Sequence, residues 1–327
     1  ELDDAVAALE KVGMKSLVLD LRNNPGGLLP QAIDVVSRFV PSGKTVVSVK
    51  GRSRYANAQE LRSSGGHTHN FPLVVMINNG SASASEIVAG AIQDYGRGVI
   101  VGTDSFGKGL VQRVFPLPYG TGLTLTTARY YTPYGRSLQR DYSSGSIYDY
   151  YTHQEEAEGG SGGAKPKPAG EAVTTANGRV LFGGRGIEPD VAVKPFEITA
   201  LRFRINEAAF FFIRQLVAGK VVGFENFKVD KQDHDLTVPP EEFQVSDRLL
   251  EAFRQYTAGI KDAGLSAENI ISQADYSRTR LREELATANH SNEAGIQVLL
   301  EVDPQIVRAL GAMPDAQKML EQNVAKK

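Results

Sequence analysis

Short apolar runs alternate with segments of helical periodicity over the first half of the chain. The runs Ser16–Leu21 and Leu73–Ile77 are rich in β-branched and apolar residues, as buried strands are. Helical patterns follow them, over Pro30–Phe39 and within Asn78–Asp94. Strands that alternate with helices of this length are typical of βαβ units, so we expect an α/β fold with a mostly parallel sheet. Further strands are expected over Thr45–Val49, Gly98–Val101, Val111–Phe115 and Leu123–Tyr131.

The second half of the chain has a different pattern. Residues 143–179 are rich in glycine, proline and charge, which predicts a flexible insertion. From Leu201 to Leu216 apolar residues recur three or four apart, as on one face of a helix. We therefore predict a core domain of residues 1–196 and an all-helical domain of residues 197–327. Further helices are expected over Pro239–Ile260, Ser266–Ala288 and Glu293–Leu310.

Composition excludes several classes of site. The chain has no cysteine, so disulfides, zinc–thiolate sites and a cysteine nucleophile are absent. The net charge of −2 provides no basic field for nucleic acid. The chain starts inside an expected helix, Leu2–Lys11, without an initiating methionine, which indicates a piece of a longer protein.

A serine-rich turn is the first candidate for chemistry. In INNGSASASE (Ile77–Glu86) a buried strand ends in Asn-Asn-Gly, and Ser81, Ser83 and Ser85 follow where a helix begins. Such a turn exposes a serine and leaves the next amide at the positive end of a helix, where an oxyanion can be held. Alternatively the serines only cap the helix.

A lysine between two glycines is the candidate base. In SFGKGLVQ, Lys108 precedes an apolar strand, and the uncharged Gln112 can hydrogen-bond its amine. Lysine accepts a proton only when it is neutral, which requires shielding from water. A solvated turn lysine is the alternative. No histidine lies at a strand end, and His67 and His69 are better explained as solvated side chains than as metal ligands.

A glycine pair supplies the third element. In DLRNNPGGL (Asp20–Leu28) it follows the end of a strand, where open α/β sheets place their sites. Adjacent glycines let the backbone approach a ligand and direct an N–H toward it. The same sequence is also typical of an ordinary turn.

These segments belong to a longer series of motifs in a fixed order. The motifs are DLRNNPGG at Asp20–Gly27, NNGSASASEIVAGAIQD at Asn78–Asp94, GTDSFGKGLVQ at Gly102–Gln112, LTLTTARYYTPYGRSLQ at Leu123–Gln139 and GIEPD at Gly186–Asp190. The region closely resembles the carboxyl-terminal processing proteases, the tail-specific serine peptidases of family S41. The resemblance implies a crotonase-like and ClpP-like core that uses a Ser–Lys dyad.

The resemblance also implies roles for single residues. The family's nucleophile lies 25 residues before its lysine, which selects Ser83 as nucleophile and Lys108 as general base. Gln112 corresponds to the glutamine that supports the lysine. The amides of Gly27 and Ala84 correspond to the oxyanion hole.

Further implications concern the whole protein. An aspartate implicated in some members corresponds to Asp94, for which a structural role at a helix end is an equal alternative. No cofactor or metal is implied, and the substrates are proteins or peptides cleaved in their C-terminal regions. We expect a bacterial, extracytoplasmic protein, periplasmic or anchored on the outer face of a membrane. The full-length parent is expected to carry the PDZ domain that precedes this core, and the helical domain is expected to act as a scaffold or in homo-oligomer formation.

Two other functions use related cores. A non-catalytic module, as in S41-like retinoid-binding proteins, would be indicated by loss of the serine or the lysine, and both are present. An enoyl-CoA hydratase-like enzyme would need two catalytic carboxylates and a coenzyme A site, for which the sequence gives no sign.

Overall fold

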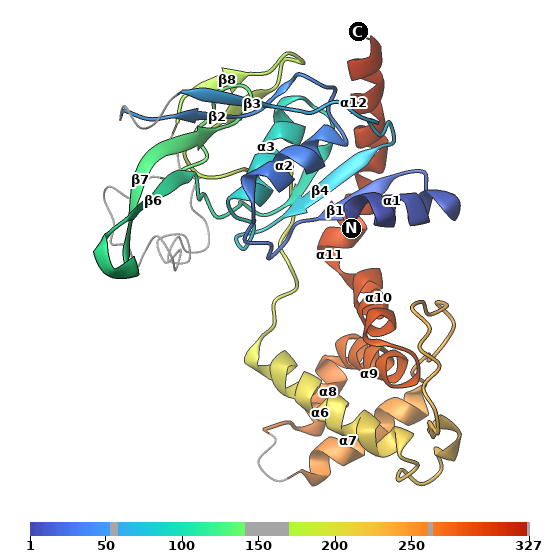
Figure 1. Ribbon diagram of the computed structural model, residues 1–327. Coiled ribbons are helices and arrows are strands. Elements are labelled where there is room, and N and C mark those ends of the chain that lie inside the picture. The colour runs from blue at the N-terminus through green and yellow to red at the C-terminus, as the bar shows by residue number, and fades with distance from the viewer. Residues whose placement is uncertain (53–57, 141–169, 261–263, 326–327) are drawn as a thin grey trace. The chain divides into compact units, whose positions relative to one another are not determined.

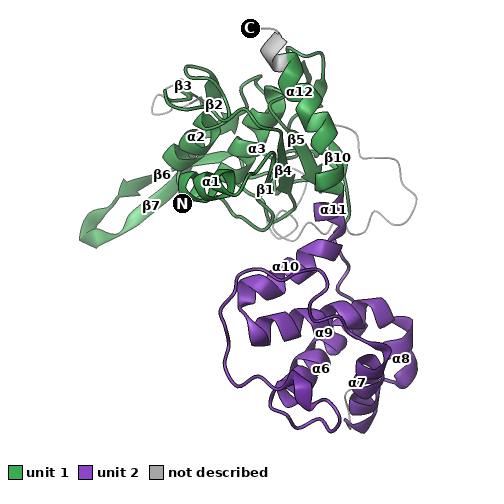
Figure 2. Cartoon of the chain, turned by 90° about the vertical axis from the view of Figure 1, so that its right-hand side faces the viewer, with its two compact units in different colours: residues 1–194, 308–327 green, residues 195–307 purple. Residues whose placement is uncertain are grey.

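The computed structural model describes residues 1–52, 58–140, 170–260 and 264–325. The chain divides into two compact units, one made of residues 1–194 and 308–327 and the other of residues 195–307 (Figures 1 and 2). The first unit mixes helices and strands, and the second is helical. The expected combination of an α/β part with a helical C-terminal region is confirmed.

A four-stranded parallel sheet forms the centre of the first unit, with the strand order β1-β4-β5-β10. Every residue of β4 is buried, as its unbroken apolar run predicts. β4 lies between β1 and β5 and runs parallel to both, so the loops that follow β1 and β4 leave the sheet at the same edge. The strands are β1 Leu17–Asp20, β4 Leu73–Ile77, β5 Val99–Gly102 and β10 Val191–Ala192.

Helices complete the core of this unit. α2 (Leu29–Ser37) has a proline in its first turn, where the missing N–H leaves no helical hydrogen bond unmade. α3 (Ala84–Asp94) is buried over its whole length. α1 (Leu2–Lys11) contributes Val6 to the same core. The C-terminal α12 (Met313–Ala325) contacts β4, so it packs with this unit.

A second, antiparallel sheet has the order β3-β2-β7-β6. Its strands are β2 Thr45–Lys50, β3 Gln59–Arg62, β6 Leu110–Pro116 and β7 Gly122–Tyr131. We expected one mostly parallel sheet, and for these strands that expectation is wrong. β6 and β7 are joined by the short connection 117–121, whereas parallel neighbours need a crossover of a dozen or more residues. β3 was not among the expected strands.

The end of the predicted insertion is a β-hairpin. β8 (Ala172–Thr174) pairs with β9 (Val180–Phe182) in antiparallel register. The Thr175 amide donates to the Arg179 carbonyl at 2.8 Å and closes the turn. The prediction of a flexible insertion over 143–179 is therefore wrong for residues 172–179, and residues 141–169 lie outside the described residues.

The second unit is built from helices around its own apolar core. Ile205, Ala209, Phe212 and Leu216 of the first helix are buried, as their spacing predicts. The helices are α6 Ala200–Val217, α7 Asp247–Gly259, α8 Ala267–Ser272, α9 Ala274–Asn289, α10 Asn292–Val302 and α11 Pro304–Gly311. α11 crosses the boundary between the units.

Three predicted helices have different limits in the structure. The helix expected from Pro239 begins only at Asp247, where the Ser246 hydroxyl caps it. The next is divided at Gln273 into α8 and α9. The last is divided before Pro304, which has no N–H to continue a helix.

Residues 308–327, expected in the helical domain, group with the first unit. Among the described residues, no helix has the length and apolar character needed to cross a bilayer.

Candidate active site

Ser83 occupies a strained turn between β4 and α3. Its backbone angles are φ 56° and ψ −112°, and residues other than glycine rarely adopt positive φ. Ala84 is the first residue of α3, so its amide lies at the positive end of the helix dipole. Strain of this kind is concentrated at functional sites.

The other two serines of the segment have structural hydrogen bonds. The Ser81 hydroxyl donates to the Leu21 carbonyl at 2.7 Å and accepts from the Asn78 amide at 2.9 Å. The Ser85 hydroxyl donates to the Asn24 carbonyl at 3.0 Å. Both serines are buried. The serine between them, at the strained turn, remains the candidate nucleophile.

The glycine pair lies directly against the serine turn. The Asn24 carbonyl accepts from the Ala82 amide at 3.1 Å. Gly26 has φ +90°, and a Cβ added there would lie 2.5 Å from the Ala82 oxygen and 2.6 Å from the Ala84 nitrogen. Only glycine allows this approach. Gly27 and Ala84 line one pocket, so the structure brings together the two residues expected to provide oxyanion-hole amides.

The carboxylate of Glu86 joins the serine turn to the lysine loop. It is fully buried, and its Oε2 accepts from the backbone amides of Ser83 at 2.9 Å and Lys108 at 2.8 Å. Its Oε1 accepts from the Gly107 amide at 2.7 Å and the Ser105 hydroxyl at 2.5 Å. Because both amides bond one oxygen, the backbone nitrogens of Ser83 and Lys108 lie within about 6 Å of each other.

Two opposing effects act on the Glu86 carboxyl. Burial is the larger effect and raises its pKa above the usual value, although the hydrogen bonds from Ser105, Lys108, Gly107 and Ser83 act to lower it. The three backbone amides can only donate, so the group facing them must accept at both oxygens. The carboxylate therefore fits this position, whereas an amide would direct its NH₂ at backbone donors.

The side chains expected to act with the serine lie at the start of the second sheet. Lys108 is exposed in the described part of the chain, so the shielding of its amine that we expected from the glycine turn is not seen there. Gln112 is exposed on β6, opposite Thr126 of β7. The pairing of the two strands shifts between Val111 and Gln112, a β-bulge of the kind that redirects side chains near sites.

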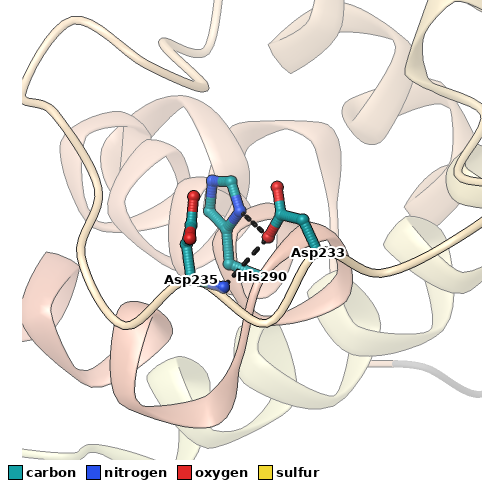
Figure 3. Close-up of side chains that lie close together, drawn as sticks. All are labelled: Asp233, Asp235 and His290. Carbon is teal, nitrogen blue, oxygen red and sulfur yellow. Dashed lines mark hydrogen bonds and ion pairs between the residues drawn. The ribbon is translucent and has the colours of Figure 1, made fainter.

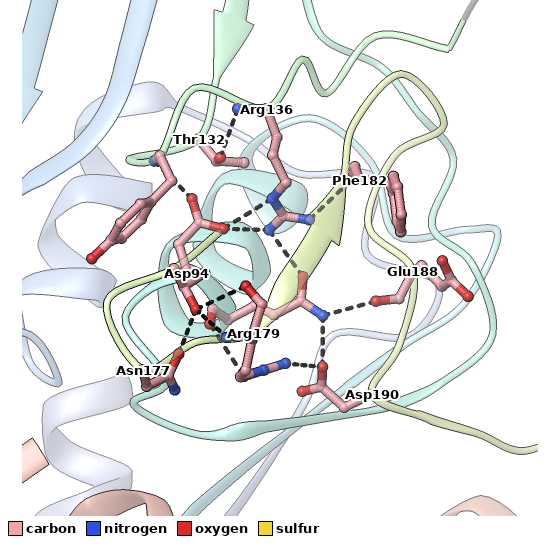
Figure 4. Close-up of polar contacts among 11 residues, drawn as sticks. Asp94, Thr132, Arg136, Asn177, Arg179, Phe182, Glu188 and Asp190 are labelled. Carbon is pink, nitrogen blue, oxygen red and sulfur yellow. Dashed lines mark hydrogen bonds and ion pairs between the residues drawn. The ribbon is translucent and has the colours of Figure 1, made fainter. Parts of the chain in front are cut away.

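Asp94 lies away from the serine turn. It ends α3, about 15 Å from the start of the helix at 1.5 Å per residue. Its Oδ1 accepts from Nε and Nη2 of Arg136 at 2.9 and 2.6 Å, and its Oδ2 accepts from the Tyr134 amide at 2.9 Å (Figure 4). Both side chains of the ion pair are buried. The structure thus places Asp94 in a structural ion pair rather than with Ser83 and Lys108.

An apolar pocket of about 240 Å³ adjoins the glycine pair. Its wall contains few polar side chains, so it suits an apolar group of a ligand. It is lined by Gly26, Gly27 and Ala84 together with Leu2, Leu19, Leu21, Leu28, Val35 and Val88, among others.

The first half of the chain is similar to known proteins. Residues 1–151 match the model of "Peptidase family S41". This segment belongs to peptidase family S41. The chain is 53% identical over 126 residues to a carboxy-terminal-processing protease of Bartonella bacilliformis, covering 38% of this chain and 29% of the relative. It is 41% identical over 140 residues to a carboxyl-terminal-processing protease of Synechocystis, covering 43% of this chain and 32% of the relative.

One solved structure that is similar to part of the chain is also known. The photosystem II D1 C-terminal processing protease is 31% identical, with a TM-score of 0.41, over 58% of this chain and 38% of that one. The chain thus spans about a third of the length of the relatives it matches.

Sequence reasoning assigned no role to Glu86, Ser105 or Gly186. Glu86 stands three positions after Ser83, the Ser-x-x-Glu spacing of a capping box, which could have suggested a carboxylate at this turn. Ser105 donates to that carboxylate and accepts from the Ile187 amide at 2.7 Å. A Cβ at Gly186 would lie 2.5 Å from the Ser105 hydroxyl oxygen, so the GIEPD motif packs against the back of the site.

We expect the contact made by Gly26 to be needed for activity. Gly26→Ala should lower kcat/KM for peptide hydrolysis about a hundredfold, because a displacement of about 1 Å in a catalytic group can cost that much. Gly13→Ala is the matched control, since Gly13 also has φ +90° but nothing lies within 4 Å of an added Cβ. Equal losses of kcat/KM in the two variants would contradict the prediction.

The second unit contains a cluster of three side chains that could bind a metal ion, Asp233, Asp235 and His290. One potential ligand atom from each lies within 4.8 Å of the other two (Figure 3). Nδ1 of His290 lies 2.5 Å from Oδ1 of Asp233, and Nε2 lies 3.3 Å from Oε1 of Glu242. His290 directly follows α9, where the helix dipole favours positive charge. An ion pair at a helix end explains this buried imidazole without a metal.

His290 and Glu283 of this unit hold protons more tightly in the folded state. Burial lowers the pKa of His290, but the hydrogen bond to Asp233 and the charges of Asp233 and Glu242 outweigh it, so the pKa is raised. Burial raises the pKa of Glu283 to about 7. The stabilisation from His290 is complete below 6.5 and is lost as pH rises through its folded pKa. The stabilisation from Glu283 is lost as the pH rises from 4.5 to about 7.

The stability of residues 195–307 should therefore decrease with rising pH. We expect the thermal midpoint of this unit to fall by about 5 °C between about pH 5 and pH 8, measured by calorimetry. Glu283→Gln removes the titrating carboxyl and should flatten the curve below about pH 7. Glu293→Gln, at an exposed glutamate of α10, should leave the curve unchanged. A midpoint that rises over this range would count against the assignment.

Proposed function

We propose that this chain carries the catalytic core of a serine endopeptidase that works through Ser83 and Lys108. The observation that carries the proposal is the shared carboxylate oxygen of Glu86, which accepts from both backbone amides. The backbones of a serine on a strained turn and of a potential base are thereby tied to one buried carboxylate, beside the pocket that contains Gly27 and Ala84. This arrangement matches the requirements of nucleophilic catalysis at a carbonyl.

In the proposed reaction, the neutral amine of Lys108 takes the hydroxyl proton of Ser83 as the oxygen attacks the scissile carbonyl. The oxyanion of the tetrahedral intermediate is held by the amides of Gly27 and Ala84. The protonated amine then gives its proton to the leaving nitrogen, and an acyl-enzyme remains. Water, activated by the neutral amine, releases the acyl group and restores the serine. Gln112 supports the lysine by a hydrogen bond to its amine.

The proposal extends to the substrate and the setting. The apolar lining of the pocket suits an apolar side chain next to the scissile bond. We propose that substrates are unstructured or exported proteins cleaved in their C-terminal regions. The support for this is that similar proteins are named carboxyl-terminal-processing proteases. The core is proposed to be crotonase-like, in an extracytoplasmic protein whose full length includes a PDZ domain. The helical unit of residues 195–307 is a candidate for homo-oligomer contacts.

Digestion of an unstructured protein tests the proposal. The chain is incubated with β-casein, and new termini are identified by mass spectrometry at several times. We expect cleavage that follows apolar residues, because their side chains fill the pocket beside Gly27. A reaction without new termini, or with cleavage unrelated to apolar residues, would contradict the proposed activity or the proposed pocket, respectively.

A further inference from the structure

A groove of about 950 Å³ lies on the second sheet, outside the site described above. It is formed by the end of β2 with Gly51 and Arg52, and by residues of β6 and β7. We call it the basic groove. The residues that matter for its chemistry are Lys50, Arg52, Leu110, Phe115, Arg129 and Tyr131.

Positive charge is concentrated in the groove, and none of the described residues that line it carries a carboxylate. Lys50 and Arg129 are directly paired across β2 and β7, and like charges in this position destabilise a sheet. Both are exposed, as is Arg52. None of the lining residues is acidic, and within the described residues these three cations make no ion pair. A repulsive pair without a partner is what an anionic ligand would stabilise.

The groove also has an apolar wall. Nζ of Lys50 lies 5.0 Å from the centre of the Tyr131 ring. Leu110, Phe115 and Leu125 line the same space, and Leu125 is 46% exposed. A ligand that fits must therefore combine negative charge with apolar groups.

The position of the groove identifies the kind of ligand. Leu110, which opens β6, lines it and is two residues from Lys108, about 7 Å along an extended chain. We propose that the basic groove binds the substrate polypeptide beyond the scissile bond and selects segments rich in acidic and apolar residues. This inference rests on the proposed function, since it treats the lysine loop as part of a peptidase site.

Binding without turnover tests the inference. The Ser83→Ala chain is titrated with a fluorescein-labelled twelve-residue peptide of Glu, Leu and Phe, and with the same peptide carrying Gln for Glu, by fluorescence anisotropy. We expect the acidic peptide to bind about tenfold more tightly, with a preference that weakens as salt is added. The triple variant Lys50→Gln, Arg52→Gln, Arg129→Gln should abolish the preference and leave the affinity for the Gln peptide within about twofold.

Two further variants separate charge from folding. The triple variant Lys11→Gln, Lys15→Gln, Lys44→Gln removes equal charge from exposed lysines outside the groove and should retain the preference. Lys50→Arg with Arg129→Lys keeps the charges and should also retain it. Each variant is checked by its thermal midpoint.

Three results would overturn the inference: equal affinity for the two peptides, an unchanged preference in the groove variant, or an equal loss in the control variant. Phosphatidylglycerol vesicles or an oligonucleotide bound through the groove, with no peptide preference, would also overturn it. Failure of the proposed function is distinguishable, because a chain that cleaves nothing can still bind the acidic peptide through these three cations.

Discussion

Ser83→Ala is expected to reduce peptide hydrolysis about a thousandfold or more and to leave the folded state intact. Alanine removes the nucleophilic oxygen, so no acyl-enzyme can form. The turn itself is held by the backbone amide of residue 83, which donates to Glu86 at 2.9 Å, and the substitution keeps that amide. The measurements are kcat/KM with an internally quenched peptide and the thermal midpoint of each variant.

The neighbouring serines provide controls with the opposite behaviour. Ser81→Ala leaves the Leu21 carbonyl and the Asn78 amide without their buried partner, which should cost about 1–3 kcal/mol of stability. Ser85→Ala removes one hydrogen bond to the Asn24 carbonyl. We therefore expect lower midpoints with substantial remaining turnover. Parental turnover in Ser83→Ala, or its loss only in the Ser81 or Ser85 variant, would refute the choice of nucleophile.

Local patterns in the sequence predicted most elements of the first unit. The run Leu73–Ile77 is apolar at every position, and it forms the fully buried β4. Pairing between strands was harder to foresee, because an apolar run does not reveal which strand will be its neighbour. The short connection between β6 and β7 was the available signal for an antiparallel pair.

The site was predictable only in part for a similar physical reason. The serine, lysine and glycine motifs indicate which segments could carry catalytic residues. The choice among Ser81, Ser83 and Ser85, however, depended on family resemblance. The structure adds an independent reason, since the outer two hydroxyls bond backbone groups and Ser83 has the strained backbone. Glu86 escaped notice because its role depends on donors 19 to 22 residues away, which meet only in the fold.

Lys108→Arg is expected to be as damaging as Lys108→Ala, with turnover reduced about a hundred- to ten-thousandfold in both. Arginine retains the positive charge but stays protonated in proteins, so it cannot accept the serine proton. The backbone amide of Lys108 donates to Glu86 at 2.8 Å, and both substitutions keep that amide, so the loop should keep its position. The loss can then be assigned to the side chain rather than to a displaced loop.

Comparison of the two variants decides between a base and a fixed charge. Turnover is measured at several pH values with saturating peptide, beside Lys44→Arg as a control at an exposed lysine outside the site. If Lys108 only provides positive charge near the oxyanion, the arginine variant should retain near-parental turnover and the alanine variant should not. If it is the base, the two variants should agree within about threefold, and both should lie far below the parent at every pH measured.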